Sequence, residues 1–374
     1  MPLDLPSDET RAWLTLLRAP GLGPVGLREL LGRHASAAAV MARVRGESRI
    51  PEAARAWLAA PDTAAIEQDL AWLEHANHHL LTWAGQDYPS LLRNVPGAPA
   101  ALFVVGDPIH LWSSQIAIVG ARSASAGGVA NARSFAKAFV QAGNAITSGL
   151  AEGIDGAAHA AALDAGGVTI AVLGTGPDLI YPRQHEALAA RIVAHGALVS
   201  EFPPGTPGKP EHFPRRNRII AGLSLGTLVI EASLNSGSLI TARLAAEQGR
   251  EVFALPGSIH SPLARGCHRL IRDGAKLVET ADDVLDELRG AGGLLADGLR
   301  ERLAGTDVTP AGAYSAHADD PDYARLIAAM AAAPAAMDEL VARTGMSAAA
   351  LSSMLLVLEL EGSIVAENGR YARR

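Results

Sequence analysis

The sequence predicts an α/β fold: an extended Rossmann-like, doubly wound and mostly parallel sheet, with an α-helical domain before it and a winged-helix domain after it. The main observation is that apolar, β-rich runs such as IAIVG and GTLVIEA alternate with Ala-rich helical runs such as ANARSFAKAFVQAG from Gln115 onward. Such alternation is typical of strand–helix–strand units, whose parallel strands are covered by helices on both faces. The second observation is that the flanking regions contain helical patterns without this alternation.

The N-terminal region, residues 1–82, is predicted to be helical, with no strand in residues 8–80. The runs AWLTLLRAP and VGLRELLGR flank the turn PGLGP at residues 20–24, a pattern typical of a helix-hairpin-helix (SAM-like) domain. The turn amides of such a hairpin can hold a DNA phosphate. Because the following helix is not very basic, a packing role is the alternative. Residues 85–113 are expected to form an extended connector with one short strand.

Residues 83–288 are predicted to form the sheet domain, with about seven strands from Gln115 onward. Residues 289–318 lack periodicity and are expected to be a linker. In residues 319–374 a helix, MDELVARTG, a turn, SAAALSSMLLVLELEG and a hairpin predict a helix-turn-helix with a wing. The last of these helices is apolar and acidic where a helix that recognises duplex DNA carries Arg, Lys, Asn or Gln. Packing or partner binding is therefore favoured for it.

Composition limits the class of protein. A net charge of −7 and a pI of 5.9 argue against a protein that coats nucleic acid with its whole surface, so any DNA site must be local. The single cysteine, Cys267, has no partner for a disulfide or a zinc site and is expected to be packed in the core. The chain opens without a leader pattern, and no apolar run approaches the ~20 residues of a membrane span, so a cytoplasmic protein without membrane contact is expected.

The first strand-to-helix turn, residues 119–125, favours phosphate over a cofactor. A dinucleotide fingerprint, G-x-G-x-x-G, needs a second glycine where Arg122 stands, so nicotinamide and flavin are disfavoured and no cofactor is expected. Arg122 and Ser123 at a helix start suit a phosphate group, although a solvated turn residue is the alternative for Arg122. The chain has no G-x-x-x-x-G-K-[ST] motif, so ATP turnover by that route is unsupported.

The second turn, TSGLAEGIDGAAH, carries Ser148, Gly149 and Gly153. Glycines at a strand end let a phosphate approach the backbone closely, and tight helix–sheet packing is the alternative. Asp155 and His159 stand one helical turn apart, which suits an acid–base pair or two metal ligands. No third ligand is evident nearby, so no metal site is expected.

The most informative stretch is the Pro-rich loop from Glu201 that leads through Lys209 into HFPRRNRIIAGLS. A cationic helix start next to an aromatic ring suits single-stranded DNA, because charges follow the phosphates while the ring stacks on a base. The alternative is a salt-bridged helix start with the ring in the core. The candidate DNA-binding residues of this stretch are Lys209, Phe213, Arg215, Arg216, Asn217 and Arg218.

A further anion site is predicted after the strand GTLVIEA. Ser236, Gly237 and Ser238 stand at a strand-to-helix junction and offer two hydroxyl groups beside free helix amides. Arg243, in the helix that follows, is added to the candidate DNA-binding residues. Ligands of such sheets bind at the carboxyl ends of the strands, so all these loops, and Arg122 with the 209–218 segment above all, are expected to share one surface.

Together these segments closely resemble the DNA-processing protein A (DprA/Smf) family. The matching pieces are YPSLLRNVPGAPAALFVVGD, IAIVGAR, TSGLAEGIDGAAH, HFPRRNRIIAGLS, EASLNSGSLITAR and ALPGS, and the match covers about residues 85–288. The resemblance implies a homodimer, not an enzyme, that binds single-stranded DNA, protects it and loads RecA recombinase onto it during natural transformation. It also implies DNA contact by Arg122 and by Lys209, Phe213, Arg215 and Arg216.

Two other classes of function remain as alternatives. One is a nucleotide N-glycosidase of the lysine-decarboxylase-like group, whose P-G-G-x-G-T-x-x-E signature is loosely matched by Gly222, Gly226, Thr227 and Glu231. The other is a sequence-specific transcription regulator that uses the winged helix. Release of free base from nucleoside monophosphates would support the first, and preference for one duplex sequence would support the second.

Overall fold

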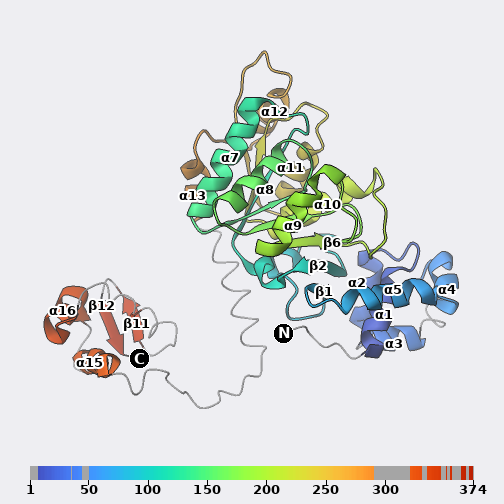
Figure 1. Cartoon of the computed structure of the whole chain (residues 1–374), viewed down its shortest axis with the longest axis horizontal. Helices are drawn as coiled ribbons and strands as arrows, with labels where there is room; N and C mark the ends of the chain where they lie inside the picture. Colours follow the sequence, from blue (N-terminus) through green and yellow to red (C-terminus); the bar gives the residue numbers. More distant parts are fainter. Residues whose placement is uncertain are drawn as a thin grey trace. The chain divides into compact units, whose positions relative to one another are not determined.

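A nine-stranded sheet organises most of the chain (Figure 1). The computed structural model describes residues 7–34, 36–43, 50–289, 321–330, 335–346, 351, 354–355, 364–367 and 370–373. Within them the chain divides into two units, Met1–Gly305 and Thr306–Arg374. Apart from Arg289, the predicted linker lies outside the described residues, as does most of the predicted helix SAAALSSMLLVLELEG.

The strands of the large sheet run in the order β1-β2-β6-β5-β4-β3-β7-β8-β9. Those from β3 to β9 are parallel, as predicted, while β2 pairs antiparallel with β6 and β1 with β2. Their bounds are β1 His78–Thr82, β2 Ala101–Gly106, β3 Gln115–Gly120, β4 Ala145–Ser148, β5 Thr169–Val172, β6 Ala197–Ser200, β7 Gly226–Ile230, β8 Glu251–Ala254 and β9 Lys276–Leu277.

Helices cover both faces of the sheet, because the parallel strands are apolar on both sides. In β3, Ile116 and Ile118 pack toward one helical layer, whereas Ala117 and Val119 pack toward the other. The first layer contains α7 (Ala126–Gln141), α8 (Ile154–Asp164), α9 (Glu186–His195) and α13 (Ala281–Leu288). The second contains α10 (His212–Leu223), α11 (Ser238–Glu247) and α12 (Arg265–Arg272), and Cys267 is buried there as expected.

The prediction that residues 8–80 contain no strand is wrong at its end. Residues 78–82 form β1, which pairs with β2 and closes one edge of the sheet. The strand is short, and the pair His78-His79 hides the apolar–polar alternation that indicates a strand. The sheet therefore has two antiparallel strands beyond the seven predicted, of which β2 is the short strand expected in the connector.

The helices of the N-terminal region are α1 (Ser7–Leu17), α2 (Pro24–Arg33), α3 (Ala37–Arg43), α4 (Glu52–Ala59) and α5 (Thr63–Leu73). They enclose a core that includes Trp13, Leu16 and Leu30 and extends to Ala101 of β2. Gly21, in the turn between α1 and α2, has a φ of +75°, a conformation that L side chains rarely adopt. Shorter helices are α6 (Ser90–Arg93), η2 (Pro108–Trp112) and η3 (Arg183–His185).

The second unit contains α15 (Pro321–Ala329), α16 (Met337–Thr344) and a sheet of order β10-β12-β11. Its strands are β10 Ala335–Ala336, β11 Ile364–Glu367 and β12 Arg370–Arg373. Leu326, Leu340 and Leu355 lie in its core. Gly345 ends α16 with a φ of +69°, at the turn predicted after MDELVARTG. In neither unit is a described helix long and apolar enough to span a membrane.

Candidate nucleic-acid interface

The candidate site lies where the order of the sheet reverses. Strands β4, β5 and β6 follow on one side of β3, and β7, β8 and β9 follow on the other. Gly120 of β3 pairs with Ile230 of β7, so the two strands end side by side. Their chains then leave in opposite directions, which opens the crevice where sheets of this kind bind ligands.

A cleft of about 780 Å³ occupies this crevice. Segments that follow β3, β5, β6 and β7 all contribute to its lining, so candidate residues far apart in the sequence lie on one surface. Its charged, polar and aromatic lining residues are Arg122, Ser123, Asp155, Tyr181, Phe213, Arg216, Asn217, Ser233, Ser236, Ser238 and Thr241.

Arg122 is the exposed cation of this cleft. Its guanidinium carbon lies 5.8 Å from the centre of the Phe213 ring, within cation–π range, and it makes no ion pair or hydrogen bond with another described residue. The backbone behind it is fixed by Gly153, whose φ is +75° and where a Cβ would overlap the carbonyl oxygens of Ala121 and Arg122. A free guanidinium on a fixed loop can pair with a phosphate without first breaking an internal ion pair.

Two aromatic rings extend from this arginine into the cleft. Phe213 is half-buried, and its ring reaches Gly174, where an added Cβ would lie 2.8 Å from the ring. The ring centre of Tyr181 lies 5.3 Å from that of Phe213, and Tyr181 is 52% exposed. Tyr181 was not among the residues predicted from the sequence, although its position in the loop after β5 places it at the edge of the sheet where ligands bind. Two neighbouring rings can stack more than one base.

The start of α11 forms the opposite wall. The hydroxyl groups of Ser236 and Ser238 lie 2.7 Å apart and line the cleft. The side-chain amide of Asn217 donates to the carbonyl oxygen of Gly237 at 3.3 Å, which ties this turn to α10. The arrangement supplies hydroxyl donors and a helix start to an anion in the cleft.

Arg216 lies beneath the cleft and is almost fully buried. Its guanidinium donates to the carbonyl oxygen of Gly149 at 2.7 Å, to that of Val172, and to the side chain of Asn217 at 3.0 Å. Burial lowers the pKa of Arg216 to about 10, while the charge of Asp155 opposes that shift, so the side chain stays cationic at neutral pH. Arg216 therefore adds positive potential under the cleft and braces its loops.

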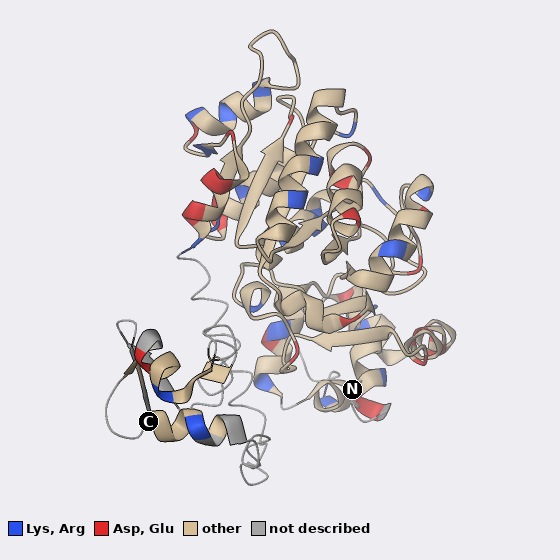
Figure 2. Cartoon of the chain, turned by 60° about the vertical axis from the view of Figure 1, so that its left-hand side comes forward, with Lys and Arg blue, Asp and Glu red and all other residues tan. Residues whose placement is uncertain are grey.

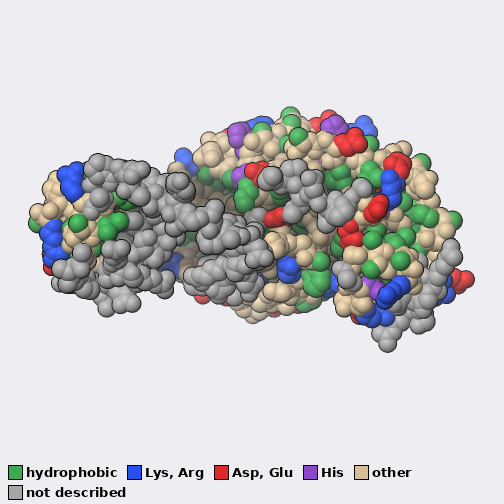
Figure 3. Space-filling view, turned by 90° about the horizontal axis from the view of Figure 1, so that it is seen from below, with side chains coloured by type: hydrophobic (Ala, Val, Ile, Leu, Met, Phe, Trp, Pro, Cys, Tyr) green, Lys and Arg blue, Asp and Glu red, His purple; other side chains and the backbone are tan. Residues whose placement is uncertain are grey.

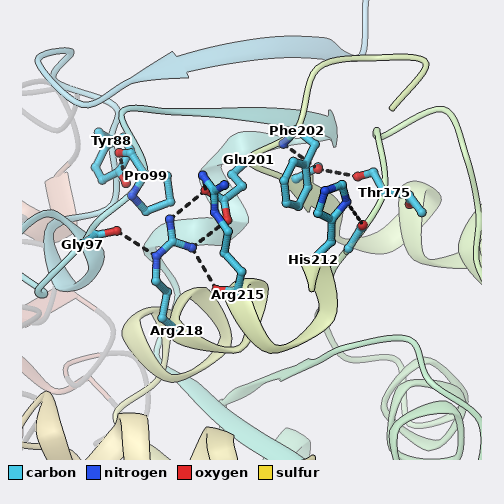
Figure 4. A network of polar contacts seen from close by, with 11 residues as sticks. Tyr88, Gly97, Pro99, Thr175, Glu201, Phe202, His212, Arg215 and Arg218 are labelled. Atoms are coloured by element: carbon cyan, nitrogen blue, oxygen red, sulfur yellow. Dashed lines mark hydrogen bonds and ion pairs between the residues drawn. The ribbon is translucent and has the colours of Figure 1, made fainter. Parts of the chain in front are cut away.

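Arg215 and Arg218 are both paired with Glu201 (Figure 4). Glu201 directly follows β6, and only 3% of its side chain is exposed. It accepts two hydrogen bonds of 2.7 Å from Arg218 and one of 2.9 Å from Arg215. Arg218 also donates to the carbonyl oxygen of Gly97 at 2.8 Å. Figure 4 shows both side chains reaching from α10 toward this carboxylate. This salt-bridged helix start, left open as an alternative by the sequence, holds α10 against the sheet.

Family models and a curated relative match this chain over most of its length. Residues 79–289 match the family model for DNA recombination-mediator protein A, residues 7–71 that for the DprA-like N-terminal HHH domain, and residues 310–370 that for the DprA winged helix domain. Protein Smf of Escherichia coli is 45% identical over 312 residues, which are 83% of this chain and 81% of that protein. The chain belongs to the DprA/Smf family. The predicted family and fold class are thus confirmed, including the N-terminal helical and C-terminal winged-helix domains.

Two solved structures of the family are similar to this chain. The X-ray structure of DprA from Streptococcus pneumoniae is 36% identical with a TM-score of 0.66, and the match covers 74% of this chain and 97% of that one. A structure describing the single-stranded DNA binding mode of DprA from Helicobacter pylori is 26% identical with a TM-score of 0.52. That match covers 57% of this chain and 96% of the other.

The remaining candidate DNA-binding residues differ in where they lie relative to the cleft. Ser148 is fully buried and donates to the carbonyl oxygen of Ile118 at 2.6 Å, and a Cβ at Gly149 would overlap the Arg216 guanidinium. Both therefore serve packing, the alternative that the sequence left open for this turn. Lys209 is exposed between two lining residues of the cleft, whereas Arg243 is not among the lining residues and pairs with Glu247 at 3.5 Å.

The start of α7, where a dinucleotide phosphate lies in cofactor-binding Rossmann domains, holds a carboxylate in this DprA/Smf chain. Glu231, at the end of β7, accepts hydrogen bonds from the amide of Ser125 at 2.8 Å and from its hydroxyl group. A Cβ at Gly128 would overlap this carboxylate. A phosphate at this position would be repelled, and the glutamate of the loose glycosidase match is engaged in capping a helix.

Asp155 and His159 do not bond to each other. Asp155 accepts from the amide of Gly149 at 3.1 Å, and burial raises its pKa. His159 is fully buried, its Nδ1 lies 2.7 Å from the hydroxyl oxygen of Thr169, and burial lowers its pKa to about 3. A neutral, enclosed imidazole is a structural group here. Within the described ranges, no cluster of three or more His, Cys, Asp or Glu side chains is placed to hold a metal ion.

The cationic character of the site is local. In Figure 2 the positions of basic and acidic residues are spread over many of the helices around the sheet. On the face seen in Figure 3, described side chains of both signs are interspersed with hydrophobic ones. Because the net charge is −7, any electrostatic attraction of an anion to this cleft must come from the few cations in and beneath it.

Proposed function

We propose that this chain binds single-stranded DNA in the cleft at the carboxyl ends of β3, β5 and β7, protects it, and loads RecA recombinase onto it during natural transformation. Turnover of a substrate is not part of the proposal. The observation that carries it is the 5.8 Å contact between Arg122, in the loop after β3, and Phe213, at the start of α10, beside the exposed ring of Tyr181. Charge and stacking are the two contacts that a single strand needs.

The residues of the interface divide into two groups. Direct contact with DNA is proposed for Arg122, Ser123, Tyr181, Lys209, Phe213, Asn217, Ser236, Gly237 and Ser238. Support of the cleft from beneath or beside is proposed for Ser148, Gly149, Gly153, Arg215, Arg216 and Arg218. Arg243 stays at the margin. Two findings support this assignment: the chain belongs to the DprA/Smf family, and it is similar to the Helicobacter pylori DprA structure that describes a single-stranded DNA binding mode.

The decisive experiment compares single-stranded with duplex DNA of mixed sequence in a fluorescence anisotropy assay over a range of salt. We expect tighter binding of the single strand, and an affinity that falls with salt by about 0.7 log units per log unit for each phosphate neutralised. Arg122→Glu should weaken binding and make the salt dependence shallower. Equal binding by the variant and the parent would show that the DNA lies elsewhere.

The recombination step needs its own measurement. RecA is added to an oligonucleotide already covered by single-stranded DNA-binding protein, and its ATP hydrolysis is followed with and without this chain. We expect the chain to shorten the lag before hydrolysis begins. An unchanged lag would remove RecA loading and leave DNA binding intact. The proposal includes a homodimer that acts in the cytoplasm without a bound cofactor, as the resemblance to DprA implies.

A further inference from the structure

A second hollow, of about 510 Å³, lies on the helical layer formed by α7, α8 and α9. Figure 1 shows α8 between α7 and α9, and the small residues Gly156, Ala157 and Ala160 of α8 line the hollow. Arg133 of α7 and Arg191 of α9 lie on its two sides. No Asp or Glu is among the described residues that line it. In a chain of net charge −7, such a hollow is suited to an anion.

Both arginines of the hollow are accessible to a ligand. Arg133 is exposed and makes no hydrogen bond or ion pair with a residue that the structure describes. Arg191 pairs with Asp164 at 2.7 Å, but its side chain is 50% exposed and that of Asp164 is 68% exposed. An ion pair so open to water is weak, so a phosphate can replace the carboxylate. A guanidinium can then hold two phosphate oxygens at once.

The loop that carries the polar wall of the hollow is fixed. His185 lies 2.9 Å from the carbonyl oxygen of Leu150 through its Nδ1. Its ring passes so close to α8 that a Cβ at Gly156 would lie 2.7 Å from His185 Cε1. Glycine at this position therefore allows the histidine to lock the end of the loop against α8. A preformed wall lowers the entropy lost when a flexible strand binds.

Two segments of the chain connect the hollow with the main cleft. A smaller space of about 230 Å³ around Phe213 shares Arg122, Tyr181 and Phe213 with the main cleft. After β4, residues 151–152 line this smaller space, and Gly153 and then Gly156 of α8 line the hollow. In the loop after β5, residues 181–182 line the first space and residues 184–185 the second. Both walls thus run from one depression directly into the other.

We propose that this hollow, marked by Arg133, His185 and Arg191, is a second phosphate-binding segment for the same single strand. A strand with its bases at Tyr181 and Phe213 continues between the loops after β4 and β5 and places further phosphates at the two arginines. Glu152, exposed at the junction, can turn toward solvent. The inference rests on the proposed DNA binding and adds a direction and a minimum length to the bound strand.

The test uses the full chain and two oligothymidylates, one of about 6 nucleotides, near the lower end of typical single-strand site sizes, and one of about 20, above their upper end. The variants are Arg133→Gln, Arg191→Gln and the pair together. For the long oligonucleotide we expect the double variant to bind at least about threefold more weakly. We also expect its salt dependence to be shallower by about 1.4, which is about 0.7 for each of two lost contacts. For the short one we expect no change.

The matched control is Arg11→Gln. Arg11 resembles Arg191 in that its side chain is 46% exposed and paired with a carboxylate, Glu67, but it lies on α1. Equal weakening for both lengths, an equal effect of the control, or no effect on the long strand would each overturn the inference. Failure of the proposed function would look different: the parent would not bind even the short strand, or Arg122→Glu would bind it unchanged. Melting temperatures of the variants verify folding.

Discussion

Replacing Arg218 with alanine tests whether the arginines of α10 serve the fold or the DNA. The guanidinium of Arg218, only 12% exposed, holds both carboxylate oxygens of Glu201, which is 3% exposed. Removing one partner of a buried pair costs about 3–5 kcal/mol because the other charge is left in a poor solvent. Arg215 keeps one contact of 2.9 Å with Glu201, which places the expected loss near the lower end, about 3 kcal/mol.

Urea unfolding followed by circular dichroism measures this loss as a lower midpoint with an unchanged slope. In a thermal scan the same change lowers the melting temperature by roughly 6–12 °C, since about 1 kcal/mol corresponds to roughly 2–4 °C in domains of comparable size. A loss below about 1 kcal/mol, the value of an exposed pair, would refute the buried-cluster argument. Arg215→Ala is the internal comparison: its side chain is 46% exposed, and we expect a loss of about 1 kcal/mol or less.

In DNA binding, unlike in stability, Arg122 should matter more than Arg218. At a temperature where Arg218→Ala is folded, the affinity of this variant for an oligonucleotide should depend on salt as that of the parent does, because no phosphate contact is lost. Arg122→Ala should change stability by no more than about 0.5 kcal/mol, as expected for an exposed side chain that makes no ion pair or hydrogen bond with another described residue. Its salt dependence should be shallower by about 0.7. If Arg218→Ala showed the shallower dependence, the division between supporting and DNA-contacting arginines would be wrong.

Three further outcomes are expected. Tyr181→Ala should weaken oligothymidylate binding by about 1–3 kcal/mol in anisotropy titrations without changing the salt dependence, because stacking is lost and charge is not. His159 has a pKa of about 3 in the folded chain and about 6.5 when unfolded. The free energy of unfolding should therefore fall as the pH drops below about 6.5, by up to about 1.4 kcal/mol per pH unit. In urea unfolding, His159→Gln should lose less of this free energy between pH 7 and pH 5 than the parent does. Arg18 donates to Asp69 at 2.6 Å and to the carbonyl oxygen of Pro204 at 3.0 Å in the loop that leads to Lys209, so Arg18→Ala should weaken DNA binding. Arg11→Ala, which removes only a surface pair between α1 and α5, should leave DNA binding unchanged in the same titration.

The sequence predicts where the candidate site lies better than it predicts the role of each residue in it. Alternation of strands and helices implies a parallel sheet, and parallel strands end at one edge, so Arg122, Phe213 and Ser236 can be placed on one surface before any coordinates exist. The three arginines of RRNR cannot be told apart in this way. Their different roles depend on Glu201, which meets two of them only after β6 and α10 have packed.

The same limit explains what was missed. Residues 78–82 become a strand because β2 offers an antiparallel partner, and this tertiary pairing outweighs a local pattern with two adjacent histidines. Tyr181 gains its place beside Phe213 from the path of the loop after β5, which no periodicity describes. Local patterns therefore give the elements and the edge at which loops gather, whereas counterions and ring neighbours follow from packing.

The salt dependence of DNA binding by the parent protein distinguishes the number of phosphate contacts expected from the sequence from the number expected from the packing. If every cation predicted from the sequence in the first and third loops neutralised a phosphate, five side chains would contribute, and the log–log slope for a short strand would be about −3.5 at about 0.7 per contact. In the structure Arg215 and Arg218 both point to the one carboxylate of Glu201, and Arg216 is buried under the cleft beside Asp155. Arg122 and Lys209 remain, which gives about −1.4 for one short strand on one protomer. A slope near −2.8 would mean that the Glu201 cluster opens when DNA binds, because Arg215 and Arg218 would then add two phosphate contacts at about 0.7 each.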